Sequence, residues 1–271
     1  MYAVCPIDQN LNRPIHCCRL AAVVFMIPPT TVNESLIAVA VSCVLCVWCV
    51  LTHRFPPIPF VRSLPSPSPI PVNSAYRESV RNFYQEKLVP FHEEWENNGE
   101  CPRELWQDAG ANGMLSVTVP EEYGGMGLDI LFASINWQEQ SYAGTTGPGW
   151  ALHSEIVAPY LMHYGSEEQK QEWLPQMVSG DAITAIAMTE PGAGSDLQGM
   201  RTTAVKDGDD YIINGSKTFI TNGWLSDMVI VCAKTDPSKG AKGISLFVVD
   251  TKTPGFKKGK KLKKMGMKAQ E

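Results

Sequence analysis

The sequence predicts an α+β fold, in which an N-terminal all-helical domain is followed by a small antiparallel β-barrel domain. From residue 74 to 180, apolar residues recur at helical spacing. After Asp181 they form six short runs rich in Val, Ile and Thr, which is typical of strands. Helices followed by strands, rather than alternating with them, favour an α+β chain. The predicted divisions are 1–73, 74–180 and 181–271.

The first division, residues 1–73, differs in composition from the rest and is expected to lie outside the globular fold. It contains no glycine, 11 of the 20 prolines and six of the eight cysteines. Residues 35–53 are uncharged and apolar, and as a helix would span about 28 Å, just short of a bilayer core of roughly 30 Å. A membrane anchor and a targeting segment both remain open. The proline-rich residues 56–71 are expected to be an extended linker.

Charge and cysteine usage exclude some functions. The net charge is −5, so no general basic surface indicates a nucleic-acid partner. After residue 73 only Cys101 and Cys232 remain, which argues against a disulfide scaffold and favours a reducing compartment.

Five helices are expected in the second division. Pro90 should end the first helix, and Pro102 should open the second, with Leu105, Trp106 and Ala109 as its apolar stripe. The predicted helices are 76–88, 102–113, 128–142, 150–164 and 166–180, the last beginning at a capping box. Three histidines without ligand spacing are expected at the core edge or surface: His92, His153 and His163.

Six strands are expected in the third division. Asp207-Gly208 and Asn214-Gly215 are interpreted as hairpin turns, because both pairs suit a positive φ. The many lysines between 257 and 268 are interpreted as a solvated hairpin face, with an acidic partner or membrane surface as the alternative. The predicted strands are 182–188, 200–206, 211–213, 217–221, 228–234 and 244–250.

The glycine-rich run Thr189–Gly199 is the most informative segment. Three glycines and a proline permit a sharp turn whose N–H groups suit a phosphate bridge; a plain strand-to-strand turn is the alternative. Its glycine spacing does not fit the dinucleotide fingerprint, and no amphipathic helix is expected after it. Ser216 stands where a P-loop needs glycine, so that interpretation is also rejected.

Several segments in the same order resemble the acyl-CoA dehydrogenase family of flavoenzymes, over about residues 74–271. Besides Thr189–Gly199, they are Pro120–Gly127, Tyr164–Lys170, Asn214–Lys217 and Phe219–Gly223. Features that most resemble the long-chain members are Met188, Gly147-Pro148-Gly149, Phe219 and Lys264–Gln270.

The resemblance implies an FAD-dependent α,β-dehydrogenation of fatty acyl-CoA to trans-2-enoyl-CoA, a step of fatty acid β-oxidation. It also implies electron-transfer flavoprotein as the electron acceptor, a homotetramer and the mitochondrial matrix as location. Alternatives from other classes are a truncated isoform that binds flavin or acyl-CoA without turnover, and a helical–β protein tethered to a membrane by residues 35–53.

The resemblance also implies roles for particular residues. Thr189 would bond the pyrimidine edge of the flavin, and Phe219 would pack against the ring. Thr221 would approach N5, and Ser195 would lie near the pyrophosphate and the CoA arm of the substrate. Glu190 is assigned to the structure of the loop and not to proton transfer. The full set expected at the cofactor is Ile186, Ala187, Met188, Thr189, Glu190, Pro191, Gly192, Ala193, Gly194, Ser195, Phe219, Ile220 and Thr221.

By the same resemblance, a C-terminal helical bundle with the catalytic glutamate would follow the β domain, beyond Glu271. No catalytic base is therefore expected within these residues. Without general-base catalysis, typically worth about 10²–10⁴-fold, the chain alone is expected to show negligible dehydrogenase activity.

Overall fold

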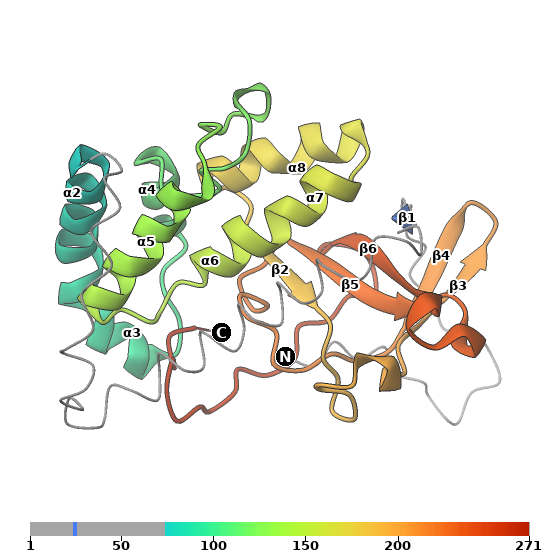
Figure 1. The fold of residues 1–271 in the computed structure, drawn as a ribbon. Helices are drawn as coiled ribbons and strands as arrows, with labels where there is room; N and C mark the ends of the chain where they lie inside the picture. The colour runs from blue at the N-terminus through green and yellow to red at the C-terminus, as the bar shows by residue number, and fades with distance from the viewer. Residues whose placement is uncertain (1–23, 26–73, 271) are drawn as a thin grey trace, which may run out of the picture.

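A computed structural model describes residues 24–25 and 74–270, arranged as a helical block beside a twisted sheet (Figure 1). The predicted apolar helix 35–53 and the rest of residues 1–73, apart from the strand at 24–25, lie outside the described residues. Among the helices that are described, none has the length and apolar character needed to cross a bilayer.

The helical block follows the predicted order, except that an unpredicted helix lies at residues 92–98 and the predicted helix 150–164 is divided by a π-helical turn. Its α-helices are α2 (Ser74–Phe83), α3 (His92–Asn98), α4 (Glu104–Ala111), α5 (Ile130–Ala143), α6 (Trp150–Leu152), α7 (Ala158–Tyr164) and α8 (Glu167–Ser179). π-helical turns at Tyr84–Leu88 and His153–Val157 extend α2 and join α6 to α7.

The first helix ends just before Pro90 as predicted, since its π-helical extension stops at Leu88, but a further helix that was not predicted comes next. Pro90 lies in a 3₁₀ turn, Val89–Phe91, and α3 follows directly. Proline is tolerated there because the first residues of a helix need no intrahelical N–H bond. Helix α3 was missed because its sequence is almost entirely polar and has only Trp95 buried.

Local sequence does define α4 and α8 as predicted. Leu105, Trp106 and Ala109 are the buried face of α4. At the start of α8, Ser166 accepts the Gln169 N–H while the Gln169 side chain accepts the Ser166 N–H, which completes the capping box.

The sheet contains most of the predicted strands, and β5 and β6 have the predicted bounds. In chain order they are β1 (Val24–Phe25), β2 (Thr184–Ala187), β3 (Thr203–Asp207), β4 (Asp210–Asn214), β5 (Met228–Lys234) and β6 (Ile244–Asp250). The turn at Asp207-Gly208 joins β3 and β4 as expected, with Gly208 at a φ of 64°.

The prediction of an antiparallel barrel is wrong, because the sheet is mixed. Its order is β1-β6-β5-β3-β4, and β2 also pairs with β5. Strands β2 and β3 both run parallel to β5 along the same edge: Ala187 pairs with Val231, and Thr203 pairs with Lys234. The chain thus leaves this edge after Ala187 and returns to it three β5 residues further on. The spacing of short strands could not reveal this excursion.

The strand predicted at 217–221 and the hairpin turn at Asn214-Gly215 are also wrong. No strand is found between β4 and β5; residues 215–227 form an irregular loop. Phe219 and Asn222 have φ values of 56° and 63°, which a strand does not accommodate.

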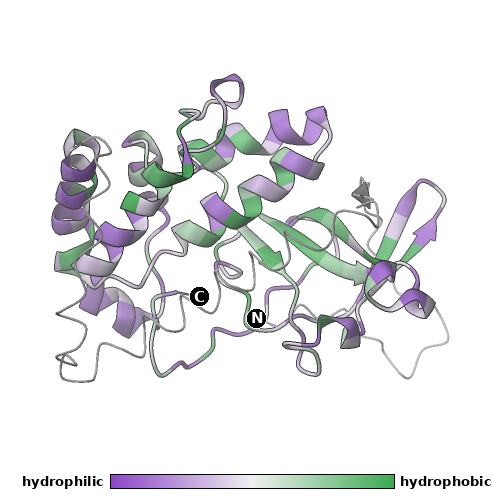
Figure 2. Cartoon of the chain, viewed as in Figure 1, coloured by the Kyte–Doolittle hydropathy of each residue, from purple (hydrophilic) through white to green (hydrophobic). Residues whose placement is uncertain are grey.

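The sheet is covered on one face by helices and has apolar side chains on both faces. Leu161 of α7 and Leu174 of α8 pack with Met228 and Ile230 of β5. The other face contains Val229 and a fully buried Phe247. Figure 2 shows this pattern as green central strands beside helices whose outer faces are purple.

One of the three histidines does not lie where it was expected. His153 is completely buried, between the helices and the sheet. Its Nε2 lies 3.0 Å from the Met177 carbonyl oxygen, and its Nδ1 lies 3.2 Å from the Thr184 nitrogen. It therefore joins a helix turn, α8 and β2.

The lysine-rich segment, residues 257–268, is an extended stretch without strands rather than the expected hairpin face. It carries the chain from the sheet back toward α3 (Figure 1). Glu96 of α3 accepts the N–H groups of Lys268 and Ala269, both at 3.0 Å. Lys258 donates to the carbonyl oxygens of Trp224 and Ser226.

Candidate functional site

Two segments that include the predicted runs Thr189–Gly199 and Phe219–Gly223 lie against each other at one edge of the sheet. The first is the turn after β2, Met188–Gly199; the second is Lys217–Gly223 in the loop before β5. The Thr218 N–H donates to the Thr189 carbonyl oxygen at 2.9 Å, and the Thr189 hydroxyl donates to the Thr218 carbonyl oxygen. The fold thus brings together residues that are about 30 positions apart.

The glycine-rich turn presents backbone N–H groups to solvent. It is closed by reciprocal backbone hydrogen bonds between Glu190 and Ala193, at 2.9 and 3.1 Å. Within the described chain, no acceptor is found for the N–H groups of Gly192, Gly194 and Ser195. A Cβ on either glycine would meet nothing within 4 Å, so the surface is open. Such a turn can accept an anion.

The second segment exposes a large aromatic side chain beside this turn. Phe219 is 74% exposed, whereas Ile220 is buried and Thr221 is half-buried. A positive φ is uncommon for a bulky residue and costs roughly 1–3 kcal/mol. An exposed phenyl ring held in this conformation is suited to packing against a flat ligand.

Asn222 anchors the second segment to the start of α6 and to β2. Its Nδ2 donates to the carbonyl oxygens of Gly149, at 2.9 Å, and Thr184, at 3.2 Å. A Cβ on Gly149 would lie 2.1 Å from Asn222 Oδ1 and 2.8 Å from the Thr221 methyl group. Glycine is therefore required at 149 for the loop to approach the start of α6.

The Glu190 carboxylate is fully engaged in hydrogen bonds and an ion pair within the protein, in agreement with its assignment to the structure of the loop. Its carboxylate accepts the Arg201 and Thr202 N–H groups, at 2.6 and 2.9 Å, and the Thr202 hydroxyl. Lys217 Nζ lies 2.9 Å from Oε1. Burial raises the pKa of this carboxyl, but the hydrogen bonds from Thr202, Arg201 and Lys217 outweigh it and lower the pKa to about 2.

The structure places the other predicted cofactor residues at different depths. Ile186 and Ala187 are buried in β2, where their side chains belong to the core. Ala193 is buried as well, whereas Met188 is half-buried. The predicted cofactor residues of the turn that are exposed are Pro191, Gly192, Gly194 and Ser195.

Two residues that organise the site were assigned no role in the sequence analysis. Lys217 and Asn222 are both buried, and each bonds to the other segment or to its supports. A lysine within a run that otherwise resembles a strand was the available signal for Lys217. Asn222 precedes Gly223, and this Asn-Gly pair, the same type that was interpreted as suiting a positive φ at 214–215, was the available signal for Asn222.

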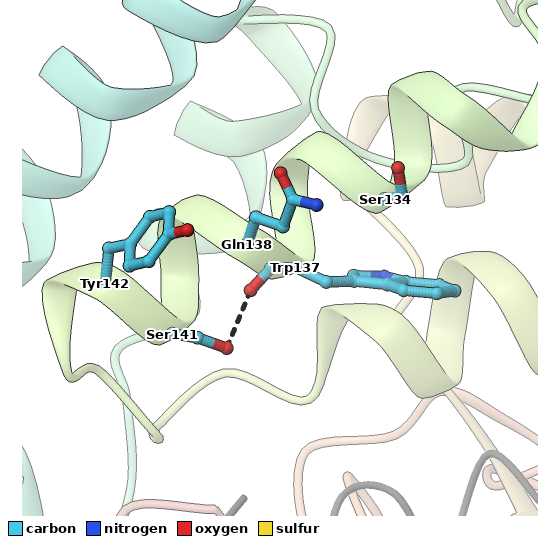
Figure 3. A pocket seen from close by; sticks show the side chains of 5 residues that line it. All are labelled: Ser134, Trp137, Gln138, Ser141 and Tyr142. Atoms are coloured by element: carbon cyan, nitrogen blue, oxygen red, sulfur yellow. Dashed lines mark hydrogen bonds between the residues drawn. The ribbon is translucent and has the colours of Figure 1, made fainter. Parts of the chain in front are cut away.

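A separate hollow of about 340 Å³ lies on the outer side of α5 (Figure 3). It contains none of the predicted cofactor residues, and Ser141 in its wall donates to the Trp137 carbonyl oxygen. Its lining is Ser134, Trp137, Gln138, Ser141 and Tyr142.

Comparison with known proteins gives a consistent result for both divisions of the fold. Residues 72–181 match the acyl-CoA dehydrogenase N-terminal domain, and residues 185–271 match the acyl-CoA dehydrogenase middle domain. The mitochondrial long-chain specific acyl-CoA dehydrogenase of Rattus norvegicus is 58% identical over 198 residues, which are 72% of this chain and 46% of that protein. The chain spans about half the length of the curated relatives it matches.

Solved structures show the same similarity. An acyl-CoA dehydrogenase from Geobacillus kaustophilus has a TM-score of 0.70 and 50% identity, covering 72% of this chain and 52% of that one. A glutaryl-CoA dehydrogenase from Mycobacterium smegmatis, in complex with FADH2, has a TM-score of 0.64 and 35% identity, covering 72% and 49%.

Proposed function

This chain belongs to the acyl-CoA dehydrogenase family, and from that premise we propose that it forms the FAD-binding part of an enzyme that oxidises long-chain acyl-CoA thioesters. The observation that supports this most directly is the pairing of an open, N–H-rich turn with the exposed ring of Phe219.

The described residues fit FAD in both charge and shape. The pyrophosphate of FAD needs N–H donors, which the turn at Gly192–Ser195 offers without competing acceptors in the described chain. The flat isoalloxazine ring needs an apolar face, which Phe219 offers. Between these two points the hydrogen bonds of Thr189 and Thr218 hold the segments together.

Each residue at the site then has a specific task. Bound FAD would supply the hydride acceptor for α,β-dehydrogenation. Thr189 would present its hydroxyl oxygen to the pyrimidine edge, since its proton is donated to Thr218. Thr221 would direct a hydroxyl toward the N5 side, and Ser195 would lie between the cofactor phosphates and the CoA arm. The contribution of these residues is orientation of the two reactants.

The substrate, partner and location follow from the relatives and are part of the same proposal. The rat relative is named as long-chain specific and mitochondrial, which supports long-chain acyl-CoA as substrate and the mitochondrion as location. We further propose electron-transfer flavoprotein as the acceptor of the electrons and a homotetramer as the assembly.

A second candidate is a protein that binds flavin or acyl-CoA without turnover. In agreement with this candidate, Glu190 cannot replace the catalytic base that the family resemblance places beyond Glu271, because a carboxylate with a pKa near 2 and several hydrogen bonds is a poor general base.

Titration of the purified protein with FAD tests the proposal. We expect saturable binding and a flavin absorption spectrum, and Phe219→Ala should weaken binding about tenfold because the ring loses its apolar support. Val205→Ala, which removes another exposed apolar side chain on β3, should leave the affinity unchanged. Absence of FAD binding by the wild-type protein would refute the proposal, and dye-coupled turnover of palmitoyl-CoA separates the two candidates.

A further inference from the structure

The two halves of the site are connected by a buried charge. Lys217 is only 4% exposed, and Glu190 is only 8% exposed. Lys217 Nζ lies 2.9 Å from Glu190 Oε1 and 2.9 Å from the Met188 carbonyl oxygen, so it contacts the first segment on both sides of Thr189. It is two positions before Phe219 in the second segment.

The backbone around Lys217 is fixed by further bonds. Thr218, the residue between Lys217 and Phe219, makes the reciprocal hydrogen bonds with Thr189. Four bonds therefore connect Met188–Glu190 with Lys217–Thr218. The backbone that leads into Phe219 is therefore held in place by the bonds of Lys217 and Thr218 to the glycine-rich turn.

Stability alone is a weak explanation for this ion pair. Desolvation of two charges offsets most of their attraction, and similar-sized uncharged side chains often stabilise a core equally well. Uncharged apolar side chains would not fix the relative position of the two segments in the same way. The Lys217 ammonium must lie between the Glu190 carboxylate and the Met188 carbonyl oxygen to bond to both. The low pKa of Glu190 keeps its carboxylate ionised at neutral pH.

We propose that Lys217 is a positioning residue, which through Glu190 and Met188 sets the distance between the anion-binding turn and the Phe219–Thr221 face. This inference rests on the proposed FAD site. The ammonium does not contact the cofactor in this proposal; it holds both halves of the site in register so that the ring and the phosphates are bound together.

The test compares FAD binding by the wild-type protein with that of the double variant Lys217→Met, Glu190→Gln. This variant removes both charges together and leaves no unpaired ion. Its amide oxygen can still accept the Thr202 N–H, whereas the Arg201 N–H, which bonds to the other carboxylate oxygen, loses its acceptor. We expect FAD to bind at least about tenfold more weakly, with loss of the resolved shoulder of the flavin absorption band. The protein without FAD should remain folded, with a thermal unfolding midpoint within a few degrees of that of the wild type.

The matched control is Lys170→Met, Glu167→Gln, which removes an ion pair of 2.8 Å on α8. It should leave both the affinity and the spectrum unchanged. If the Lys217 and Glu190 double variant folds and binds FAD with wild-type affinity and spectrum, the inference is wrong.

Lys217→Arg decides the question if the double variant does not fold. The longer guanidinium keeps the charge but should push the two segments apart, which shifts the flavin absorption maximum. An unchanged spectrum and affinity in this variant would also overturn the inference. Failure of the wild-type protein itself to bind FAD would overturn the proposed function, and this inference with it.

Discussion

At the junction of the helices and the sheet, burial shifts the pKa values of two neighbouring side chains in opposite directions. Burial lowers the pKa of His153 to about 4, although its hydrogen bond to the Met177 carbonyl oxygen opposes this effect. Burial raises the pKa of Glu155, two residues later, to about 7. The π-helical turn His153–Val157 therefore carries a neutral imidazole and a carboxyl that is partly protonated at neutral pH.

Glu155→Gln should stabilise the protein at high pH. The folded state binds the Glu155 proton more tightly than the unfolded state, so its contribution to stability is complete below about pH 4.5 and is lost as the pH rises through 7. An uncharged amide avoids this loss. We expect the free energy of unfolding in urea to rise by about 3 kcal/mol at pH 8 and to be unchanged at pH 4. Glu86→Gln, at an exposed position of the other π-helical turn, should show no such pH-dependent gain.

At the scale of secondary structure elements, α8 depends on its capping box. Ser166→Ala removes the acceptor for the Gln169 N–H, and we expect the free energy of unfolding to fall by about 1 kcal/mol. Ser141→Ala, within α5, should change it by less than about 0.5 kcal/mol. Equal losses in the two variants, measured by urea denaturation, would contradict the assigned role of the cap.

The loop before β5 depends on Asn222 in two separable ways. Asn222→Ala leaves the carbonyl oxygens of Gly149 and Thr184 without its amide and keeps a side chain at positive φ, so we expect a loss of about 2–3 kcal/mol. Asn222→Gly relieves the backbone strain and should cost about 1 kcal/mol less. The free energies of unfolding of the two variants test this order, with Asn214→Ala at the exposed end of β4 as control.

Sequence periodicity predicted most elements, because their stability is local or follows a simple apolar pattern. The capping box at Ser166 and the stripe of α4 are examples. The polar helix α3 and the loop around Phe219 were not predictable in this way, since tertiary contacts hold them. The segments of the candidate site were identified from their residues, but the bonds that join them, such as those of Lys217, depend on chain positions that only the fold brings together.

At the scale of the whole molecule, Arg103 joins the helical block to the sheet. From the start of α4 it forms an ion pair with Asp227 and donates to the carbonyl oxygens of Leu225, at 3.2 Å, and Asp181, at 2.6 Å. Asp227 also accepts the Ile183 N–H, at 2.8 Å. One guanidinium thus connects α4, the entry to β2 and the entry to β5.

Arg103→Met should weaken this junction as a unit. We expect the free energy of unfolding to fall by about 1–2 kcal/mol and amide exchange at residues 181–183 and 225–227 to accelerate together. Lys87→Met removes an exposed ion pair with Asp108 and should cost less than about 0.5 kcal/mol. Acceleration in one segment alone would show that Arg103 does not couple them.

The return of the chain to the same edge of β5 has a consequence for protein engineering. Ala187 and Thr203 both pair with β5, so the register of the sheet is fixed on each side of the segment between them. Residues can therefore be inserted or deleted at the tip of this segment, Gly192–Ser195, without shifting the register. Ligand preference can therefore be redesigned by grafting a different tip onto an unchanged scaffold, provided that the graft retains the carboxylate facing Lys217.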